Sequence, residues 1–233
     1  LAVAACLVLM VSLGAGWQPQ RWVDDLGADY VSAPGEVKTV TLADQSQVTL
    51  DADSAIAVDF SHGERHIQLR RGAGFFSVAH TGQAFVVHAD SGEVRVLGTQ
   101  FEVRLQPAGA QVTVLSGRVG VTPSAQGPQQ ILTAGQQVAY VEGVADERHA
   151  VDSESRLGWR DGWLNYYKTP LADVVKDLGR YYPGRILLFN DELGARRVSG
   201  SFPSKDPEAV LKALQAVLGF EQHSVLGRLI VVR

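Results

Sequence analysis

The six histidines are the residues of this chain whose side chains could ligate a metal or move a proton at neutral pH. Only His62 and His66 lie close together in sequence, and they flank a turn instead of sharing one face of a helix. Zinc sites use three or four ligands and commonly combine histidine with cysteine. The chain has one cysteine, Cys6, so the sequence predicts neither a zinc site nor an intrachain disulfide bond.

The glycine and serine motifs of common enzyme classes are absent from the sequence. The glycine-rich segment 71–75 (RGAGF) lies between predicted strands and does not open a helix, so it is not a dinucleotide-binding loop. No Gly-x-Ser-x-Gly nucleophile motif occurs, and the carboxylates are scattered over turns and polar strand faces. We therefore expect no catalytic site, no bound metal and no cofactor.

The charge balance argues against a nucleic-acid partner. The net charge is −4, and no strongly basic stretch occurs. Residues 30–150 carry 12 acidic and 8 basic side chains, whereas residues 151–233 carry 10 and 12. This change of sign supports a domain boundary near residue 150.

The first 17 residues, LAVAACLVLMVSLGAGW, contain no charged side chain. As a helix rising 1.5 Å per residue they would span roughly 25 Å, the short end of what crosses a bilayer. Trp17 ends this run and Trp22 lies soon after it, and tryptophan favours the membrane interface. A secretory signal peptide is the alternative, but it needs basic residues before the apolar run and none precede it here. The sequence predicts a transmembrane helix over 1–17 and a juxtamembrane connector over 18–33.

Residues 34–150 read as an all-β domain, because short apolar-patterned segments alternate with turn signals at regular spacing. Such spacing is typical of a sandwich or of a solenoid-like fold. The predicted strands cover 37–42, 47–50, 56–60, 66–69, 75–78, 85–88, 94–96, 99–105, 111–115, 118–121, 130–133 and 137–141.

The apolar alternation slips by one residue around Gly98 and Thr99. Val94 and Val96 are apolar at even positions, whereas Phe101, Val103 and Leu105 are apolar at odd positions. A slip of one residue moves a strand's side chains to the other face of the sheet. Glycine inside a strand pattern often marks a bulge. We expect a bulge and structural corner at Gly98-Thr99 that keeps all five apolar side chains buried.

Residues 156–233 read as a small α/β domain with two β-α-β halves. The first half runs from an extended piece at 162–167 through a helix to a strand at 185–189. Thr169 is the expected N-cap of that helix, with Pro170 at its first position. The second half repeats the order, with an extended piece at 198–202, a helix after Pro207 and a strand at 221–225, and residues 229–232 add a last strand.

Aromatic residues gather around the boundary between the two domains. They are Trp159, Trp163, Tyr166, Tyr167, Tyr181 and Tyr182. Two interpretations are open. Most of them fill the core of the second domain, or some face outward and form a protein-docking surface, where Trp and Tyr are enriched.

The chain resembles the FecR family in motifs that run in order through nearly its whole length. Two long ones are IQLRRGAGFFSV at 67–78 and VLGTQFEV at 96–103. The others lie at 35–36, 40–50, 85–87, 114–119, 132–136, 159–164, 170–171 and 180–181. One departure occurs at Asp44-Gln45-Ser46, where family members usually have Asp-Gly-Ser.

The resemblance implies a non-enzymatic, single-span protein of the bacterial inner membrane with residues from about 18 onward in the periplasm. A cytoplasmic segment upstream of Leu1 would hold an extracytoplasmic-function (ECF) sigma factor. The periplasmic part would sense the N-terminal signalling domain of a TonB-dependent outer-membrane receptor loaded with an iron–siderophore complex. The C-terminal half is similar to secretin/TonB N-terminal (STN) domains, and proteases process members of the family.

A different interpretation is a membrane-anchored periplasmic binding or adhesion module, for example for envelope glycans. An upstream sequence without a helical sigma-binding segment would favour that interpretation.

Overall fold

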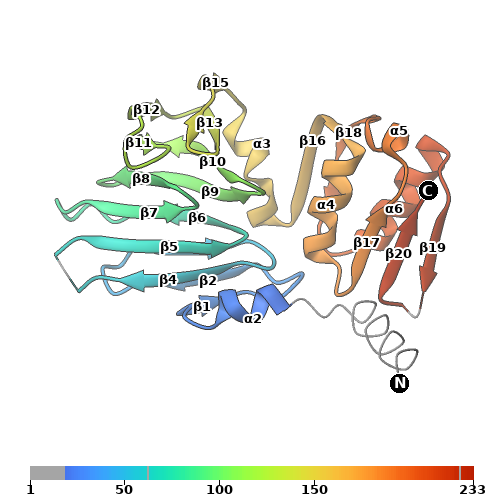
Figure 1. Ribbon diagram of the computed structural model, residues 1–233, viewed down its shortest axis with the longest axis horizontal. Helices are drawn as coiled ribbons and strands as arrows, with labels where there is room; N and C mark the ends of the chain where they lie inside the picture. Colours follow the sequence, from blue (N-terminus) through green and yellow to red (C-terminus); the bar gives the residue numbers. More distant parts are fainter. Residues whose placement is uncertain (1–18, 62, 226) are drawn as a thin grey trace. The chain divides into compact units, whose positions relative to one another are not determined.

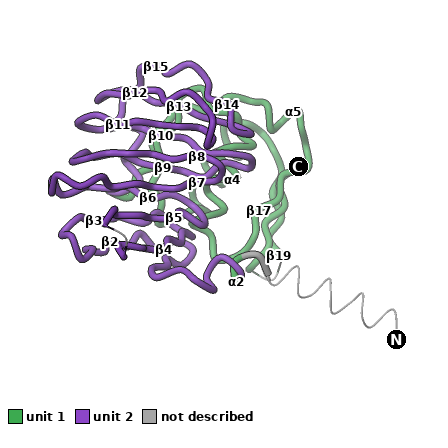
Figure 2. The backbone as a smooth tube through the Cα atoms, turned by 60° about the vertical axis from the view of Figure 1, so that its left-hand side comes forward, with its two compact units in different colours: residues 1–22, 161–233 green, residues 23–160 purple. Residues whose placement is uncertain are grey.

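The computed structural model describes residues 19–61, 63–225 and 227–233. The chain divides into two compact units, coloured separately in Figure 2. We call Val23–Arg160 the β unit and Asp161–Arg233 the C-terminal unit. The predicted transmembrane helix over 1–17 lies outside the described residues. Among the helices that are described, none combines the length and the apolar character needed to cross a bilayer.

The β unit is built almost entirely of short strands. Its elements are α2 (Pro19–Asp25, which begins before the unit), β1 (Tyr30–Val31), β2 (Lys38–Thr41), β3 (Gln47–Leu50), β4 (Ala55–Asp59), β5 (Arg65–Arg71), β6 (Ala73–Ser77), β7 (Phe85–Ala89), β8 (Gly92–Val96), β9 (Gln100–Gln106), β10 (Gly109–Ser116), β11 (Arg118–Thr122), β12 (Gln130–Thr133), β13 (Gln136–Val141), β14 (Val144–Ala145), β15 (His149–Ala150), α3 (Ser153–Arg156) and the 3-10 helix η1 (Gly158–Asp161).

These strands form two sheets that pack face to face as a sandwich (Figure 1). One sheet has the order β1-β4-β5-β7-β8-β11-β12, and the other has the order β14-β13-β10-β9-β6-β3-β2. Phe76 of the second sheet contacts Phe85 of the first, with ring centroids 6.1 Å apart, and stacks on Phe101 at 5.3 Å. Because inward side chains alternate with outward ones, the two inner faces enclose a single apolar core.

The corner at Gly98 is a crossing between the two sheets and not the predicted bulge. β8, which ends at Val96, belongs to the first sheet, and β9, which begins at Gln100, belongs to the second. Both strands point their apolar side chains into the shared core, so the change of sheet explains the one-residue slip. Phe101 is fully buried, but Leu105 is only half-buried, which corrects the expectation for that residue. A Cβ on Gly98 would approach the His80 ring to 2.8 Å, which favours glycine there.

The C-terminal unit runs twice through the order strand, helix, strand. Its elements are β16 (Trp163–Pro170), α4 (Leu171–Tyr181), β17 (Arg185–Leu188), the short α5 (Asp191–Gly194), β18 (Arg197–Pro203), α6 (Pro207–Leu218), β19 (Gln222–Val225) and β20 (Leu229–Val232). The first strands of the two halves pair with each other, β16 with β18. The later strands form a second sheet with the order β17-β20-β19, in which β17 lies at one edge.

The two long helices begin differently. At α6 the side chain of Asp206 accepts a hydrogen bond from the amide of Ala209, and Pro207 occupies the first helical position. At α4 the N-cap is Pro170 itself, with no side-chain cap, so the predicted capping by Thr169 is wrong. Thr169 and Pro170 instead pair with β18 as the end of β16, and this pairing displaces the helix start by one residue.

Candidate protein-docking surface

Three of the six boundary aromatics are buried and offer no surface to a partner. Trp159 is 2 % exposed, and its indole N–H donates to Glu102 Oε1 at 2.8 Å. Tyr181 belongs to the buried stripe of α4. The Tyr182 hydroxyl donates to the carbonyl of Gly227 at 3.0 Å, and burial together with Glu208 raises the pKa of Tyr182. The docking expectation therefore rests on Trp163, Tyr166 and Tyr167.

These three residues share β16, and an irregularity in that strand presents Tyr167 outward. The pairing of β16 with β18 shifts between Tyr166 and Thr169, and Lys168 has a φ of 49°. Bulges of this kind redirect side chains. Tyr167 is 73 % exposed and Trp163 is 49 % exposed, whereas Tyr166 is half-buried and its hydroxyl donates to Asp177 of α4.

A second exposed apolar surface, which the sequence analysis did not single out, lies at the open edge of β17. Together with α4 and α5, this strand borders a shallow groove of about 530 Å³. The groove is lined by Ala172, Val175, Lys176, Ile186, Leu187, Leu188, Asn190, Asp191, Gly194 and Ala195. Phe189, directly after β17, is 70 % exposed. We call these residues the β17 groove.

The backbone of β17 presents hydrogen-bonding groups to this groove. The amides of Arg185 and Phe189 donate to carbonyls on the β20 side of the strand. Since successive residues of a strand point their N–H groups to opposite edges, Ile186 and Leu188 direct theirs away from β20. An exposed edge of this kind is a template for another strand.

The other edge of the same sheet has a different character. β19 carries Gln222, His223 and Ser224 before Val225, and beside it Glu221 pairs with Arg233 at 3.0 Å. That ion pair lowers the pKa of Glu221. Polar and charged side chains protect an edge from unwanted pairing, whereas β17 presents Ile186, Leu187 and Leu188. Strand addition is therefore favoured at β17.

Tyr166 of β16 and the β17 groove contact different faces of α4. The groove is lined by Ala172, Val175 and Lys176, whereas Tyr166 reaches Asp177. At 100° per residue, Asp177 lies well around the helix from that lining. The sequence missed the groove because the run RILLF at 185–189 reads equally as a fully buried strand. Only the strand order places this run at an edge.

In the described part of the chain, no group of three or more His, Cys, Asp or Glu side chains is arranged to hold a metal ion. The β17 groove carries one lysine, Lys176, and one carboxylate, Asp191, among its lining residues. An apolar groove beside an open strand edge has the geometry that strand addition by an extended peptide requires.

Comparisons with known proteins agree on one family. Residues 28–120 match the family model described as "FecR protein", and residues 163–232 match "FecR, C-terminal". Together these matches cover more than two thirds of the chain. No curated protein sequence matches the chain.

Two solved structures are similar over most of the chain. Both are crystal structures of a "putative anti-sigma factor" from Parabacteroides distasonis ATCC 8503. The structure at 1.65 Å resolution is 27 % identical with a TM-score of 0.77, over 88 % of this chain and 97 % of that chain. The structure at 2.50 Å is 28 % identical with a TM-score of 0.76, over 87 % and 96 %.

Proposed function

Because this chain belongs to the FecR family, we propose that it is the sensing part of a sigma-factor regulator. The similarity to structures described as anti-sigma factors supports the proposal. The regulated partner is an ECF sigma factor, held by a cytoplasmic segment upstream of Leu1. The incoming signal is the N-terminal signalling domain of a TonB-dependent outer-membrane receptor that has bound an iron–siderophore complex.

In the same proposal, residues 1–17 anchor the chain in the inner membrane and residues from about 18 onward lie in the periplasm. The support is the uncharged run that ends at Trp17, with Trp22 soon after it. Proteases that cut near or within the membrane would then release the cytoplasmic segment. Co-purification of a sigma factor with the full-length protein tests the sigma-binding part of the proposal.

The receptor's signalling domain docks on the C-terminal unit, an STN-like domain. The observation that carries this proposal is the open edge of β17 beside an apolar groove. A strand of the partner adds to β17 through main-chain hydrogen bonds, and its alternate side chains enter the groove. Tyr167 and Trp163 form a separate exposed pair on β16 that extends the contact if the partner is large.

Blocking the groove tests the site. Ala172 is exposed and lies on the groove wall, so Ala172→Arg fills the groove without disturbing the core. Ala213 is exposed on α6, outside the groove, and Ala213→Arg is the matched control. The probe is the purified N-terminal signalling domain of a TonB-dependent receptor from the same organism. We expect Ala172→Arg to weaken its binding at least about tenfold, as for loss of a central interface contact, and Ala213→Arg to leave it unchanged.

The possible results test separately whether the receptor domain is the partner and whether the β17 groove is its binding site. No binding of the receptor domain to the wild-type chain, measured by calorimetry, rejects the receptor as the partner. Binding that is equal for wild type and Ala172→Arg keeps the receptor and rejects the groove. In that case Tyr167→Ala, on β16, is the next variant to measure.

A further inference from the structure

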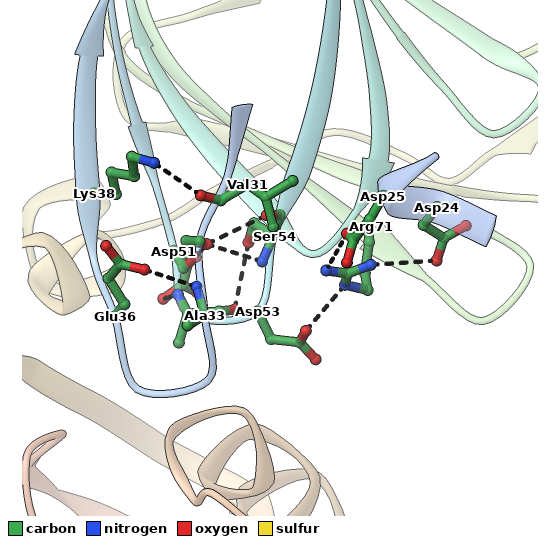
Figure 3. A network of polar contacts seen from close by, with 12 residues as sticks. Asp24, Asp25, Val31, Ala33, Glu36, Lys38, Asp51, Asp53, Ser54 and Arg71 are labelled. Atoms are coloured by element: carbon green, nitrogen blue, oxygen red, sulfur yellow. Dashed lines mark hydrogen bonds and ion pairs between the residues drawn. The ribbon is translucent and has the colours of Figure 1, made fainter. Parts of the chain in front are cut away.

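A chain of polar contacts runs across one end of the β unit, from helix α2 to the segment that leads into the C-terminal unit. Its first member is Arg71, at the end of β5 (Figure 3). The guanidinium lies 2.9 Å from Asp25 Oδ1 and 3.7 Å from Asp24 Oδ2 on α2. Its Nε donates to Asp53 Oδ1 at 2.9 Å. Arg71 therefore joins α2 to the loop between β3 and β4.

Hydrogen bonds tie that loop to the neighbouring segments of the β unit. The Asp53 amide donates to the carbonyl of Ala33, and Asp53 has a φ of 55°, which is a strained conformation for a residue with a Cβ. Ser54 Oγ accepts from the amide of Ala73 at 3.0 Å. A Cβ on Gly72 would collide with Ser54, so this approach requires glycine. The loop is therefore joined to Arg71 on one side and to the start of β6 on the other.

Asp51, in the same loop, begins the buried half of the network. Its side chain has no exposed surface, and Oδ2 accepts from Arg104 at 2.9 Å. The same Arg104 nitrogen lies 2.8 Å from Glu102 Oε1, and the Glu102 side chain is 4 % exposed. The Trp159 indole N–H donates to that same Glu102 oxygen at 2.8 Å. One guanidinium nitrogen is therefore shared by two buried carboxylates, one of which also depends on an indole.

Sharing makes this arrangement sensitive to the position of Trp159. Buried carboxylates need hydrogen-bond donors, because leaving one without a partner is costly. If the indole withdraws, Glu102 draws more strongly on Arg104, and the Arg104–Asp51 contact weakens. Asp51 shares its loop with Asp53, which orients Arg71 on α2. Trp159 lies in η1, directly before the C-terminal unit begins.

We propose that this network couples the position of Trp159 to the ion pairs between Arg71 and α2. Displacement of the segment that carries Trp159 would then weaken these ion pairs and release the helix. The coupling goes beyond the proposed function and does not depend on which partner binds, because both ends of the network lie within the β unit. It gives the fold a built-in connection from its C-terminal side to the helix at its N-terminal side.

Hydrogen exchange of the full chain tests the coupling. Trp159→Phe keeps an aromatic side chain, although a smaller one, and removes the indole N–H. Trp163→Phe makes the same change outside the network and is the matched control. We expect Trp159→Phe to speed amide exchange in residues 23–29 about fivefold or more, the low end of typical coupling factors, and Trp163→Phe to leave it unchanged. Exchange in β7, within the core, is the reference for global destabilisation.

Coupling is reciprocal, which gives a second and independent measurement. Arg71→Gln cuts the network at α2, and we expect it to speed exchange at residues 157–160 by a similar factor. This variant also serves if Trp159→Phe does not fold. Unchanged exchange of 23–29 in Trp159→Phe, or of 157–160 in Arg71→Gln, with β7 protected as in wild type, would overturn the proposal.

Discussion

Gln45 shows at the level of one residue how this chain keeps a turn that glycine usually makes. Its φ is 68°, in the left-handed region that glycine adopts most readily. The turn is fixed from both sides. Ser46 donates to Asp44 from its amide and its hydroxyl, and Arg65 donates to Asp44 Oδ2 at 2.6 Å. Burial tends to raise the pKa of Asp44, but these hydrogen bonds lower it overall.

The left-handed conformation costs a residue with a Cβ about 1–2 kcal/mol, whereas glycine costs about 0.5–1 kcal/mol through its freedom in the unfolded chain. We therefore expect Gln45→Gly to raise the free energy of unfolding of the β unit by about 0.5–1 kcal/mol. Gln47→Gly, at an exposed position of β3 two residues later, relieves no strain and should lower it by a similar amount. Urea unfolding measures both, and equal signs for the two variants would contradict this account.

His66 and His88 form a second residue-scale feature, on the outer face of the first sheet. Nδ1 of His66 lies 3.0 Å from Nε2 of His88, with the rings 10° from parallel and the centroids 5.2 Å apart. One N–H···N hydrogen bond therefore joins the two rings, and the tautomer of each ring decides which nitrogen donates. Charged side chains surround the pair. Glu64 Oε2 lies 3.1 Å from His66 Nε2, and Glu64 Oε1 lies 2.9 Å from Arg95 Nη1. Arg95 also forms an ion pair with Glu93.

Burial, with Arg95 and His66, lowers the pKa of His88 below its ordinary 6.5, although Glu93 and Glu64 oppose the shift. The unfolded chain therefore binds more protons than the folded chain as the pH falls below about 6.5, and the β unit loses stability in that range. We expect the urea midpoint to fall less between pH 7.5 and pH 5.5 in His88→Gln than in wild type. His149→Gln, at an exposed position, is the control and should keep the wild-type pH dependence. If the urea midpoint falls by the same amount in His88→Gln and His149→Gln, the histidine pair does not cause the pH dependence.

At the scale of elements, the start of α6 provides a simple test of local stabilisation. Asp206 and Glu208 both place a carboxylate near the first turn, but only Asp206 accepts a hydrogen bond from a helix amide. Loss of an N-cap side chain costs about 1 kcal/mol. We expect Asp206→Ala to lower the stability of the C-terminal unit by about that amount and Glu208→Ala to lower it by less than half. Denaturation followed by circular dichroism distinguishes the two variants.

The elements that the sequence predicts well are those whose signals are local. β3 coincides with the predicted strand at 47–50, and the helix predicted after Pro207 is α6. Leu97-Gly98-Thr99 carries a correct signal, the slipped alternation, but one strand cannot reveal that the next belongs to another sheet. α4 begins after Pro170 because pairing with β18 outweighs the capping preference of Thr169.

The candidate site was harder to predict than the elements, because it depends on contacts between residues distant in sequence. Aromatic residue type does not distinguish Trp159, buried beside Glu102, from Trp163, which is half exposed, because burial depends on contacts distant in sequence. The β17 groove follows from strand order, which no local pattern encodes. Sequence motifs therefore pointed to the family, and the structure was needed to locate the groove.

At the scale of the whole molecule, the β unit ends at Arg160, a few residues after the start predicted for the second domain. The sequence placed the second domain at 156–233, but Trp159 donates to Glu102 within the β unit. Arg160 lies over the ring of Phe75, with its guanidinium carbon 4.1 Å from the centroid. The segment 156–160 therefore belongs with the β unit, and a deletion that removes it removes part of that unit's structure.

Two truncations test this assignment. A chain that ends at Arg160 keeps Trp159 and the cation–π contact of Arg160, and we expect its β unit to retain the wild-type free energy of unfolding. A chain that ends at Ser155 exposes the site of a buried tryptophan and leaves Glu102 without its indole donor, and loss of a buried tryptophan side chain costs about 3–5 kcal/mol. Urea unfolding of both chains, followed by circular dichroism, measures the difference. Equal stability would show that 156–160 belongs with the C-terminal unit and would remove Trp159 from the network that holds α2.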